Sequence, residues 1–222
     1  MMGKREAVKA ILEGKSADRI PVIMNAFSLS VARYGYTMSE VLMNPEKMTE
    51  CMVGIRRKLG YDGLCAGVYG GIAAMMGGHL INSEGRISGN GEDVVHSFED
   101  IKKLRPYDPK QCAMLKNLLR TVQLMRETEP DEPIYVILHV PAAVAFTLMG
   151  AKPAFKAMVK NRELFMALSD YVEDAVVESS KILVDAGVDS YGFRCRILGD
   201  TVYRENLTKP VFQKAISDQI SG

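Results

Sequence analysis

The chain has 222 residues, of which 47% are hydrophobic and 25% are charged, which is typical of a folded globular protein. Its 28 Lys and Arg balance 27 Asp and Glu, so it lacks the broad positive field that nucleic-acid or anionic-membrane binding usually needs. No stretch reaches 18 uninterrupted apolar residues, and residues 1–15 form a charged amphipathic pattern rather than a signal peptide. We therefore expect a cytoplasmic protein with no nucleic-acid and no membrane partner.

The cysteines occur singly, without a CxxC pair or any other paired spacing: they are Cys51, Cys65, Cys112 and Cys195. This distribution favours reduced thiols over a disulfide framework. It also gives no zinc site, so we expect no metal ligand from the cysteines alone.

In the first third of the chain, residues 20–24 form a short apolar run that predicts a buried strand. Thr37 and Glu40 have the spacing of a capping box, and Pro45 opens a second helix. Residues 61–71, YDGLCAGVYGG, predict a second buried strand that enters a glycine-rich turn.

The rest of the chain continues this alternation. Residues 77–100 have the punctuation of a hairpin, and residues 108–130 have helical periodicity. A third strand is expected at 133–139, followed by a helix with Pro141 in its first turn. Further expected elements are a long helix at 161–186 that ends at a glycine, a fourth strand from about 188, and a last helix within 207–222. Strands that alternate with long helices predict an α/β fold with a parallel sheet.

Five segments have the order and spacing of one known family: KREAVKAILEGKSADRIPV, NPEKMTECMVGIRRKLGYDGL, SFEDIKKLRPYDP, EPIYVILHVPAAVAFTLMG and DAGVDSYGF. They resemble the uroporphyrinogen decarboxylase family, which includes the decarboxylases of haem biosynthesis and the corrinoid-linked methyltransferases. The resemblance implies a (β/α)8 barrel of the TIM type, with its site at the carboxyl ends of the strands. Residues 1–222 are then a single domain of this family.

Only four strands are clear, so we expect an incomplete barrel that corresponds to the N-terminal part of the fold. A partial barrel exposes two sheet edges, which tend to pair with another strand. Either the sequence is part of a longer chain, or a homodimer covers the opening.

The decarboxylase branch of the family carries an arginine-rich MRQAGRY-like segment after the first strand, as a clamp for substrate carboxylates. Here the corresponding stretch is IMNAFSLSVARYGY, with Asn25 where the first arginine would fall. The aspartate of the family's FSDI-like segment would fall near Tyr69, and a phenol does not carry its negative charge at neutral pH. Asp62 lies at the start of its strand, on the end that serves stability.

The methyltransferase branch uses zinc to activate a thiol, through a His-x-Cys pair and a later cysteine. Those ligands belong to the C-terminal third of the family pattern, so no metal ligand is assigned in this chain. We expect no cofactor within the chain itself; the resemblance implies a corrinoid partner and zinc for a complete family member.

The candidate site residues follow the expected strands. His139 is the candidate catalytic residue, with strand capping as the alternative. Asn25 and Tyr69 are candidate neutral substrate-binding groups, with a surface-loop role as the alternative. Arg194 and Arg196 follow the fourth strand and would favour an anionic ligand, unless they are solvated or ion-paired surface residues.

The resulting expectation is methyl transfer to a thiol or similar acceptor, with a small molecule, tetrapyrrole or corrinoid as the ligand. A uroporphyrinogen decarboxylase is the alternative enzyme. A catalytically silent binding or assembly protein is the alternative of a different class, so the sequence leaves enzymatic activity open.

Overall fold

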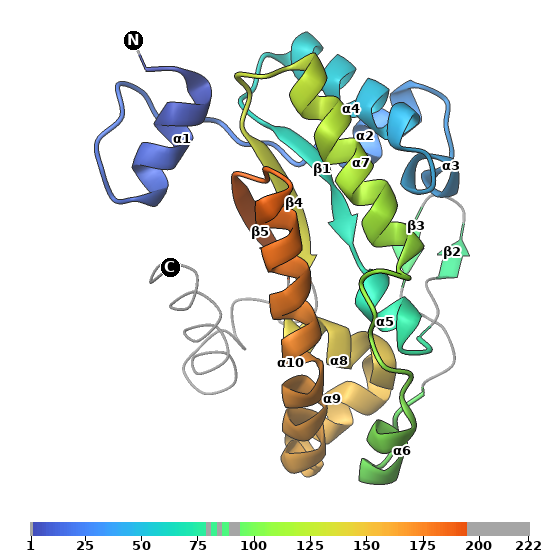
Figure 1. Ribbon diagram of the computed structural model, residues 1–222. Helices are drawn as coiled ribbons and strands as arrows, with labels where there is room; N and C mark the ends of the chain where they lie inside the picture. The colour runs from blue at the N-terminus through green and yellow to red at the C-terminus, as the bar shows by residue number, and fades with distance from the viewer. Residues whose placement is uncertain (1, 79–80, 84–85, 89–93, 195–222) are drawn as a thin grey trace.

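The computed structural model describes residues 2–78, 81–83, 86–88 and 94–194 of the chain. Its centre is a parallel sheet of three strands in the order β1 (Leu64–Tyr69), β4 (Ile134–His139) and β5 (Ser190–Arg194). The arrows of β1 and β4 in Figure 1 point toward the end of the molecule that holds α5, α8 and α9, whereas α1 lies at the opposite end. The expected α/β fold with a parallel sheet is therefore confirmed.

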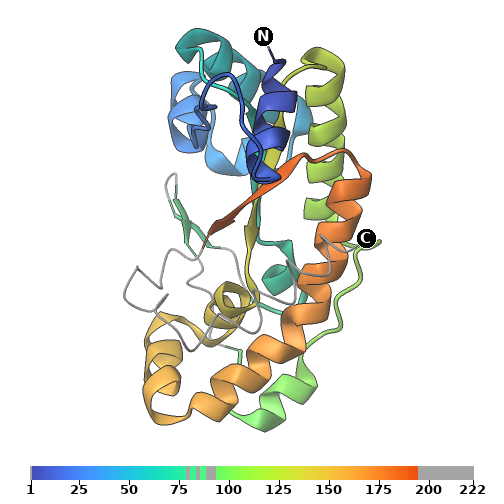
Figure 2. The ribbon, with the colours of Figure 1, turned by 90° about the vertical axis from the view of Figure 1, so that its left-hand side faces the viewer.

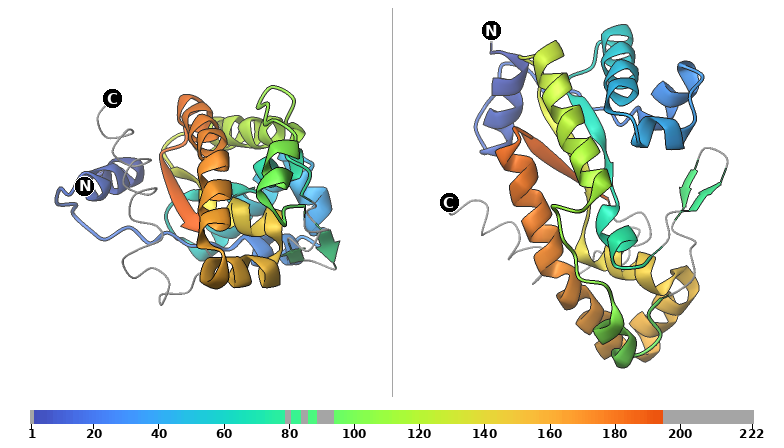
Figure 3. Two further views of the ribbon diagram at one scale, coloured as in Figure 1. Left: turned by 90° about the horizontal axis from the view of Figure 1, so that it is seen from below. Right: turned by 45° about the vertical axis from the view of Figure 1, so that its right-hand side comes forward.

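The helices are α1 (Lys4–Leu12), α2 (Phe27–Arg33), α3 (Met38–Leu42), α4 (Pro45–Leu59), α5 (Gly71–Met75), α6 (Phe98–Lys103), α7 (Ala113–Thr128), α8 (Pro141–Met149), α9 (Ala151–Lys160) and α10 (Arg162–Asp185). Helices α4 and α7 pack against β1, and α10 runs beside α7 along the sheet (Figure 3). The strand–helix–strand units β1–α7–β4 and β4–α10–β5 place long helices over one face of the sheet.

Local sequence signals explain several helix boundaries. Thr37 accepts a hydrogen bond from the backbone N–H of Glu40, whose carboxylate accepts from the backbone N–H of Thr37, so the predicted capping box is present. Asn44 caps α4, and Pro45 occupies the first helical turn, where its missing N–H costs nothing. Gly60 ends α4 in the left-handed conformation at φ 74°.

A β-bulge in β1 changes the direction of its side chains. Cys65 pairs with Tyr135, but Gly67 pairs with the next residue, Val136, so one extra residue is accommodated between them. Gly67 has φ 137°, a conformation that favours glycine. Because side chains alternate along a strand, the extra residue moves every later side chain of β1 to the opposite face.

The expected buried strand at residues 20–24 is wrong in its burial and in its extent. The segment forms one parallel bridge, between Ile23 and Asp62, and its apolar side chains are exposed, with Ile20 at 84%. In the described part of the chain, no strand pairs with the outer edge of residues 20–24, and Pro21 has no backbone N–H to donate to such a strand. The segment therefore lies beside β1 as a short edge.

The other strand predictions are confirmed. The hairpin expected within residues 77–100 is the antiparallel pair β2 (Ile81–Ser83) and β3 (Arg86–Ser88). The helix expected within 207–222 lies outside the described residues. Among the helices that the structure describes, no single one is long and apolar enough to cross a membrane, although α8 and α9 together, bent by 114°, meet that length and composition.

Each parallel strand is preceded by a buried or half-buried carboxylate, and the three carboxylates repeat one arrangement. Each accepts a hydrogen bond from a backbone N–H near the start of the preceding strand: Asp62 from Val22 at 2.8 Å, Glu132 from Gly63 at 3.3 Å, and Asp189 from Ile134 at 2.9 Å. We call this set, Asp62, Glu132 and Asp189, the carboxylate ladder. It links four neighbouring segments at the amino-terminal edge of the sheet.

Basic side chains from the helix layer and the N-terminus neutralise the carboxylate ladder. Asp62 pairs with Arg19, Glu132 with Arg56 and Lys4, and Asp189 with Arg126 and Arg5. Two of these bases belong to α1, so the ladder fixes α1 to the amino-terminal edge. The interpretation of Asp62 as a residue that serves stability agrees with this placement.

Candidate functional site

The carboxyl ends of the strands lie along one edge of the sheet, which we call the carboxyl edge. Asn25, Tyr69, His139 and Arg194 each stand at the end of one of four neighbouring segments, so the structure brings these predicted positions to the same edge. His139 pairs in register with Arg194. Figure 2 shows this edge between the sheet and helix α8.

His139 is the last residue of β4 and is partly exposed. Its neighbour Leu138 is buried and pairs in register with Tyr69, so alternation places the His139 side chain on the opposite face from Tyr69. Helix α8 starts two residues later with Pro141 at its first turn, as predicted. The imidazole is thus held at the carboxyl edge by a rigid strand–helix junction.

Tyr69 belongs to a buried hydrogen-bond network on the helix side of the sheet. Its hydroxyl lies 2.7 Å from the hydroxyl of Tyr107 and 3.4 Å from the Sγ of Cys112. The Tyr107 hydroxyl lies 2.7 Å from the Oγ of Ser179, which donates to the backbone carbonyl of Ala175 in α10. We call Tyr69, Tyr107, Cys112 and Ser179 the tyrosine network.

The tyrosine network keeps its phenols neutral. Burial, followed by the hydrogen bonds to Cys112 and Tyr107, raises the pKa of Tyr69 far above its ordinary value. Burial also raises the pKa of Tyr107. Tyr69 therefore offers a neutral hydroxyl that already has partners, and its role in substrate binding stays a prediction.

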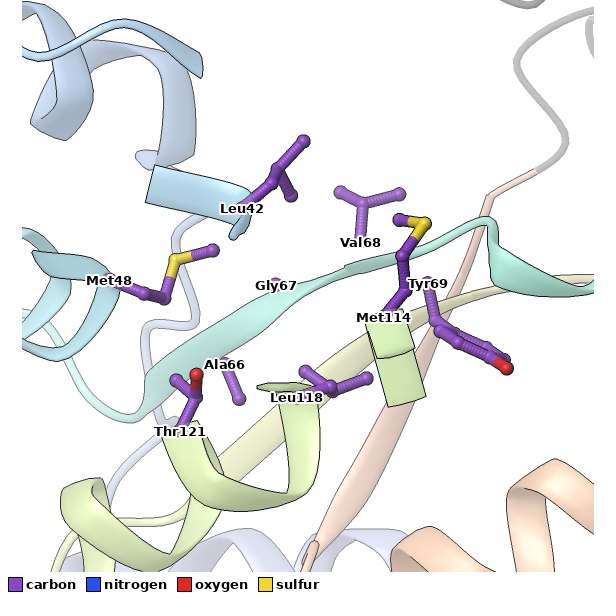
Figure 4. Close-up of a pocket in the computed structure, with 9 residues that line it drawn as sticks. All are labelled: Leu42, Met48, Ala66, Gly67, Val68, Tyr69, Met114, Leu118 and Thr121. Atoms are coloured by element: carbon purple, nitrogen blue, oxygen red, sulfur yellow. The ribbon is translucent and has the colours of Figure 1, made fainter. Parts of the chain in front are cut away.

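The bulge at Gly67 sets the face of the sheet on which the Tyr69 side chain lies. Without the bulge, the side chain of Tyr69 would lie on the same face of the sheet as that of Cys65, because residues two and four apart in a regular strand share a face. Figure 4 shows Val68 and Tyr69 on opposite sides of β1. A glycine inside a strand pattern is the only local signal that indicates such a bulge.

The glycines after β1 serve close packing. A Cβ on Gly71 would lie 2.7 Å from Cε2 of Tyr69 and 2.9 Å from Sγ of Cys112. A Cβ on Gly78 would lie 2.9 Å from the carbonyl oxygen of Ala73. Both glycines therefore permit close approach of the chain, and the small size of Gly71 lets the Tyr69 ring and Cys112 pack against the start of α5.

The remaining predicted residues differ in how far the structure describes them. Asn25 is exposed, and its Oδ1 accepts a hydrogen bond from the backbone N–H of Phe27 at 3.4 Å, at the start of α2. The backbone of Arg194 ends β5 at the carboxyl edge. Arg196 lies outside the described residues. The roles of these three residues stay predictions.

A small cavity lies on the helix side of β1 (Figure 4). Its volume is about 20 Å³, which is enough for about one water molecule. Its lining comes from α3, α4, β1 and α7: Leu42, Met48, Ala66, Gly67, Val68, Tyr69, Met114, Leu118 and Thr121. A cavity of this size and apolar lining cannot hold a tetrapyrrole, so the carboxyl edge is the better candidate site.

Comparison with known families decides the identity of the fold. The family described as "Uroporphyrinogen decarboxylase (URO-D)" matches residues 3–208. The chain belongs to the uroporphyrinogen decarboxylase family. The resemblance inferred from the sequence is thereby confirmed, and the described strands and helices are part of a TIM-type barrel.

Among solved structures, a methyltransferase from Methanosarcina mazei is similar to this chain, with a TM-score of 0.73 and 19% identity. The match covers 98% of this chain and 67% of the methyltransferase chain. The partial coverage agrees with the expectation of an incomplete barrel. Comparison with curated proteins gave no match.

The three thiols that the structure describes in this uroporphyrinogen decarboxylase family member are buried and poorly suited to bind metal or to attack a methyl group. Cys51, Cys65 and Cys112 are free and buried, and burial raises the pKa of both Cys51 and Cys65 to about 11. The described residues contain no group of three or more His, Cys, Asp or Glu that could hold a metal ion. They therefore do not provide the zinc site of the family's methyltransferases.

Proposed function

We propose that the chain forms the pocket of a corrinoid-linked methyltransferase, which moves a methyl group from a corrinoid or another methylated donor to a thiol or similar acceptor. One observation carries the proposal against the decarboxylase alternative. At the position where the decarboxylases carry a carboxylate, this chain has Tyr69, a buried neutral phenol on the helix side of the sheet. Such a group cannot stabilise positive charge on a pyrrole in the pocket.

A second observation supports the same branch. Asn25, where the decarboxylases place the first arginine of their substrate clamp, is exposed and bonds to the start of α2. A substrate with eight carboxylates needs a basic clamp, whereas a methyl donor and a thiol do not. The similarity of fold to a methyltransferase is in keeping with this preference, although fold alone does not assign activity.

In the proposed reaction, a sulfur–carbon bond forms while the bond between the methyl group and its donor breaks, and the donor keeps that electron pair. The thiol loses its proton before or during attack, because the thiolate is the nucleophile. His139, at the carboxyl edge, is proposed to accept this proton or to orient the acceptor. Arg194 is proposed to bind an anionic group of the acceptor.

Zinc in such enzymes lowers the pKa of the bound thiol. Because the described residues hold no suitable ligand cluster, the proposal places zinc ligands outside them and routes no step through the metal. We also propose a cytoplasmic location, in keeping with the free thiols, and leave a homodimer as the arrangement that would cover the open sheet edge.

The test is an anaerobic assay of the full chain with zinc, methylcob(III)alamin and a panel of small thiols, with the S-methyl product followed by mass spectrometry. We expect His139→Ala to lower the rate by about 10²-fold or more, which is the usual contribution of a positioned proton acceptor. His96→Ala, at an exposed histidine in the loop before α6, is the matched control and should leave the rate unchanged.

Two other results would replace the proposal. Formation of coproporphyrinogen from uroporphyrinogen would assign the decarboxylase function. Binding of a corrinoid without turnover of either substrate class would assign a silent binding protein.

A further inference from the structure

Helix α9 (Ala151–Lys160) presents two parallel stripes on its exposed side. Its apolar stripe consists of Ala151, Phe155 and Val159, and its basic stripe consists of Lys152, Lys156 and Lys160. Residues four apart follow one ridge of a helix, so the two stripes run side by side along the whole length of α9. The opposite side of α9, with Ala154 and Ala157, is buried against the molecule.

The apolar stripe is both exposed and held in place. Phe155 is 46% exposed, and its ring meets that of Phe146 edge to face at a centroid distance of 4.8 Å. Val159 is 84% exposed. Figure 2 shows α9 on the outside of the molecule, away from the sheet. A fixed aromatic ring beside an exposed aliphatic side chain is a typical anchor of a binding surface.

The basic stripe is not neutralised by carboxylates of its own helix. Helix α9 contains three lysines and no acidic residue. Within the part of the chain that the structure describes, no Asp or Glu forms an ion pair with any of the three. The lysines at the amino-terminal edge and in α6 do form such pairs. Other described lysines, such as Lys58 and Lys181, also have none, so what distinguishes α9 is the alignment of three such lysines along one ridge of a single helix.

The arrangement of the apolar and basic stripes argues against two other partners for this face of α9. A second copy of α9 would bring like charges together, which is destabilising. A membrane-surface helix carries its apolar stripe at the centre of its exposed side, whereas here one flank of the apolar stripe is basic and the other is buried against the protein. One half-buried phenylalanine and one valine also give little apolar area for a bilayer.

We propose that this face of α9 binds an acidic amphipathic helix of another protein, with an apolar stripe beside Asp or Glu at every fourth position. Ridges with a spacing of four on both helices would interdigitate, and the carboxylates would lie over the basic stripe. A helix of ten residues is about 15 Å long, so the contact is small and the expected Kd is on the order of 10 to 100 μM. This inference does not depend on methyl transfer.

The experiment titrates the isotope-labelled full chain with a synthetic helical peptide that has Leu at every fourth position beside a row of Glu, followed by NMR. We expect shifts at the α9 amides and at least tenfold weaker binding by the variant K152E/K156E/K160E, which should instead bind the same peptide with Lys in place of Glu. The variant F155S/V159S should also weaken binding by about tenfold.

Matched controls separate this site from general charge effects. The variant K58E/K116E/K181E makes the same change of charge at exposed lysines of α4, α7 and α10 and should bind like the wild type. Circular dichroism checks that each variant is folded.

Absence of binding to the acidic peptide, or equal loss of binding in both triple variants, would overturn the proposal. Sedimentation of the wild type with phosphatidylserine vesicles, lost only in K152E/K156E/K160E, would replace the acidic helix with a membrane surface.

Discussion

Replacement of Asp62 by Asn should remove an acid-sensitive part of the stability of this fold. Asp62 is 4% exposed at its side chain and accepts two hydrogen bonds from the guanidinium of Arg19, each at 2.7 Å. It also accepts from the backbone N–H of Val22 at 2.8 Å. Asn keeps the shape of the side chain but removes the charge and replaces one acceptor oxygen with an amide donor, so the variant removes the ion pair together with part of its hydrogen bonding.

The expected loss in the free energy of unfolding follows from the lowered pKa of Asp62. The hydrogen bonds from Arg19 are the largest cause that lowers this pKa, from an ordinary value of 3.8 to about 2. A difference of about two units corresponds to about 2.5 kcal/mol as an upper limit. Because the Arg19 side chain is 40% exposed and partly screened by solvent, we expect about 1 to 2 kcal/mol.

The sign of the pH dependence is fixed by the direction of the shift. A carboxyl group with a lowered pKa stabilises the folded state above the unfolded pKa, near pH 4, and this stabilisation is lost as the pH falls toward 2. The free energy of unfolding of Asp62→Asn should therefore lie below that of the wild type at pH 7, and the difference should shrink between pH 4 and pH 2.

The assay is urea denaturation followed by circular dichroism at pH 7, 5, 4 and 3, with Asp131→Asn as a control at an exposed carboxylate. The control should change stability by less than about 0.5 kcal/mol at each pH. A difference between Asp62→Asn and the wild type that stays constant from pH 7 to pH 3, or falls below about 0.5 kcal/mol at pH 7, would refute the reasoning.

Two further predictions concern the tyrosine network. Gly71→Ala should lower the free energy of unfolding by about 2 to 3 kcal/mol, measured by urea denaturation, because its Cβ would lie within 3 Å of the buried Tyr69 ring and Cys112 Sγ. Tyr107→Phe should cost about 1 to 2 kcal/mol in the same assay, because it removes the hydroxyl between Tyr69 and Ser179.

Matched controls exist for both substitutions. Gly3→Ala adds a methyl group where no atom lies within 4 Å, and Tyr171→Phe removes a hydroxyl from an exposed ring. If either control loses as much stability as its partner variant, the close packing or the hydrogen bonds of the tyrosine network do not explain the effect.

The order of elements could be predicted because their signals are local. The capping box at Thr37, the proline at the start of α8 and the run of apolar residues in β4 are each complete within a few residues of sequence. The alternation of strands with helices then predicts a parallel sheet. The family follows from segments that match it in order and spacing along the chain.

The direction of Tyr69 and the exposure of residues 20–24 could not be predicted, because they depend on distant partners. The side chains of β1 change faces at Gly67 because the pairing register between β1 and β4 shifts by one residue there. The partners of Tyr69, Tyr107 and Cys112, come from the segment before α7, which lies 38 and 43 residues along the chain, and α10 joins the network only through the bond between Tyr107 and Ser179. The apolar run at 20–24 has the composition of a buried strand, but burial requires a neighbour on its outer edge.

The carboxylate ladder and the candidate site lie at opposite edges of the sheet. The carboxylate ladder concentrates buried negative charge at the amino-terminal edge, where five basic side chains neutralise it. A strand of six residues spans about 20 Å, which is about twice the Debye length at physiological salt. The ladder therefore has little influence on the electrostatic potential at the carboxyl edge, and we expect substitutions in the ladder to change stability without changing which ligand binds.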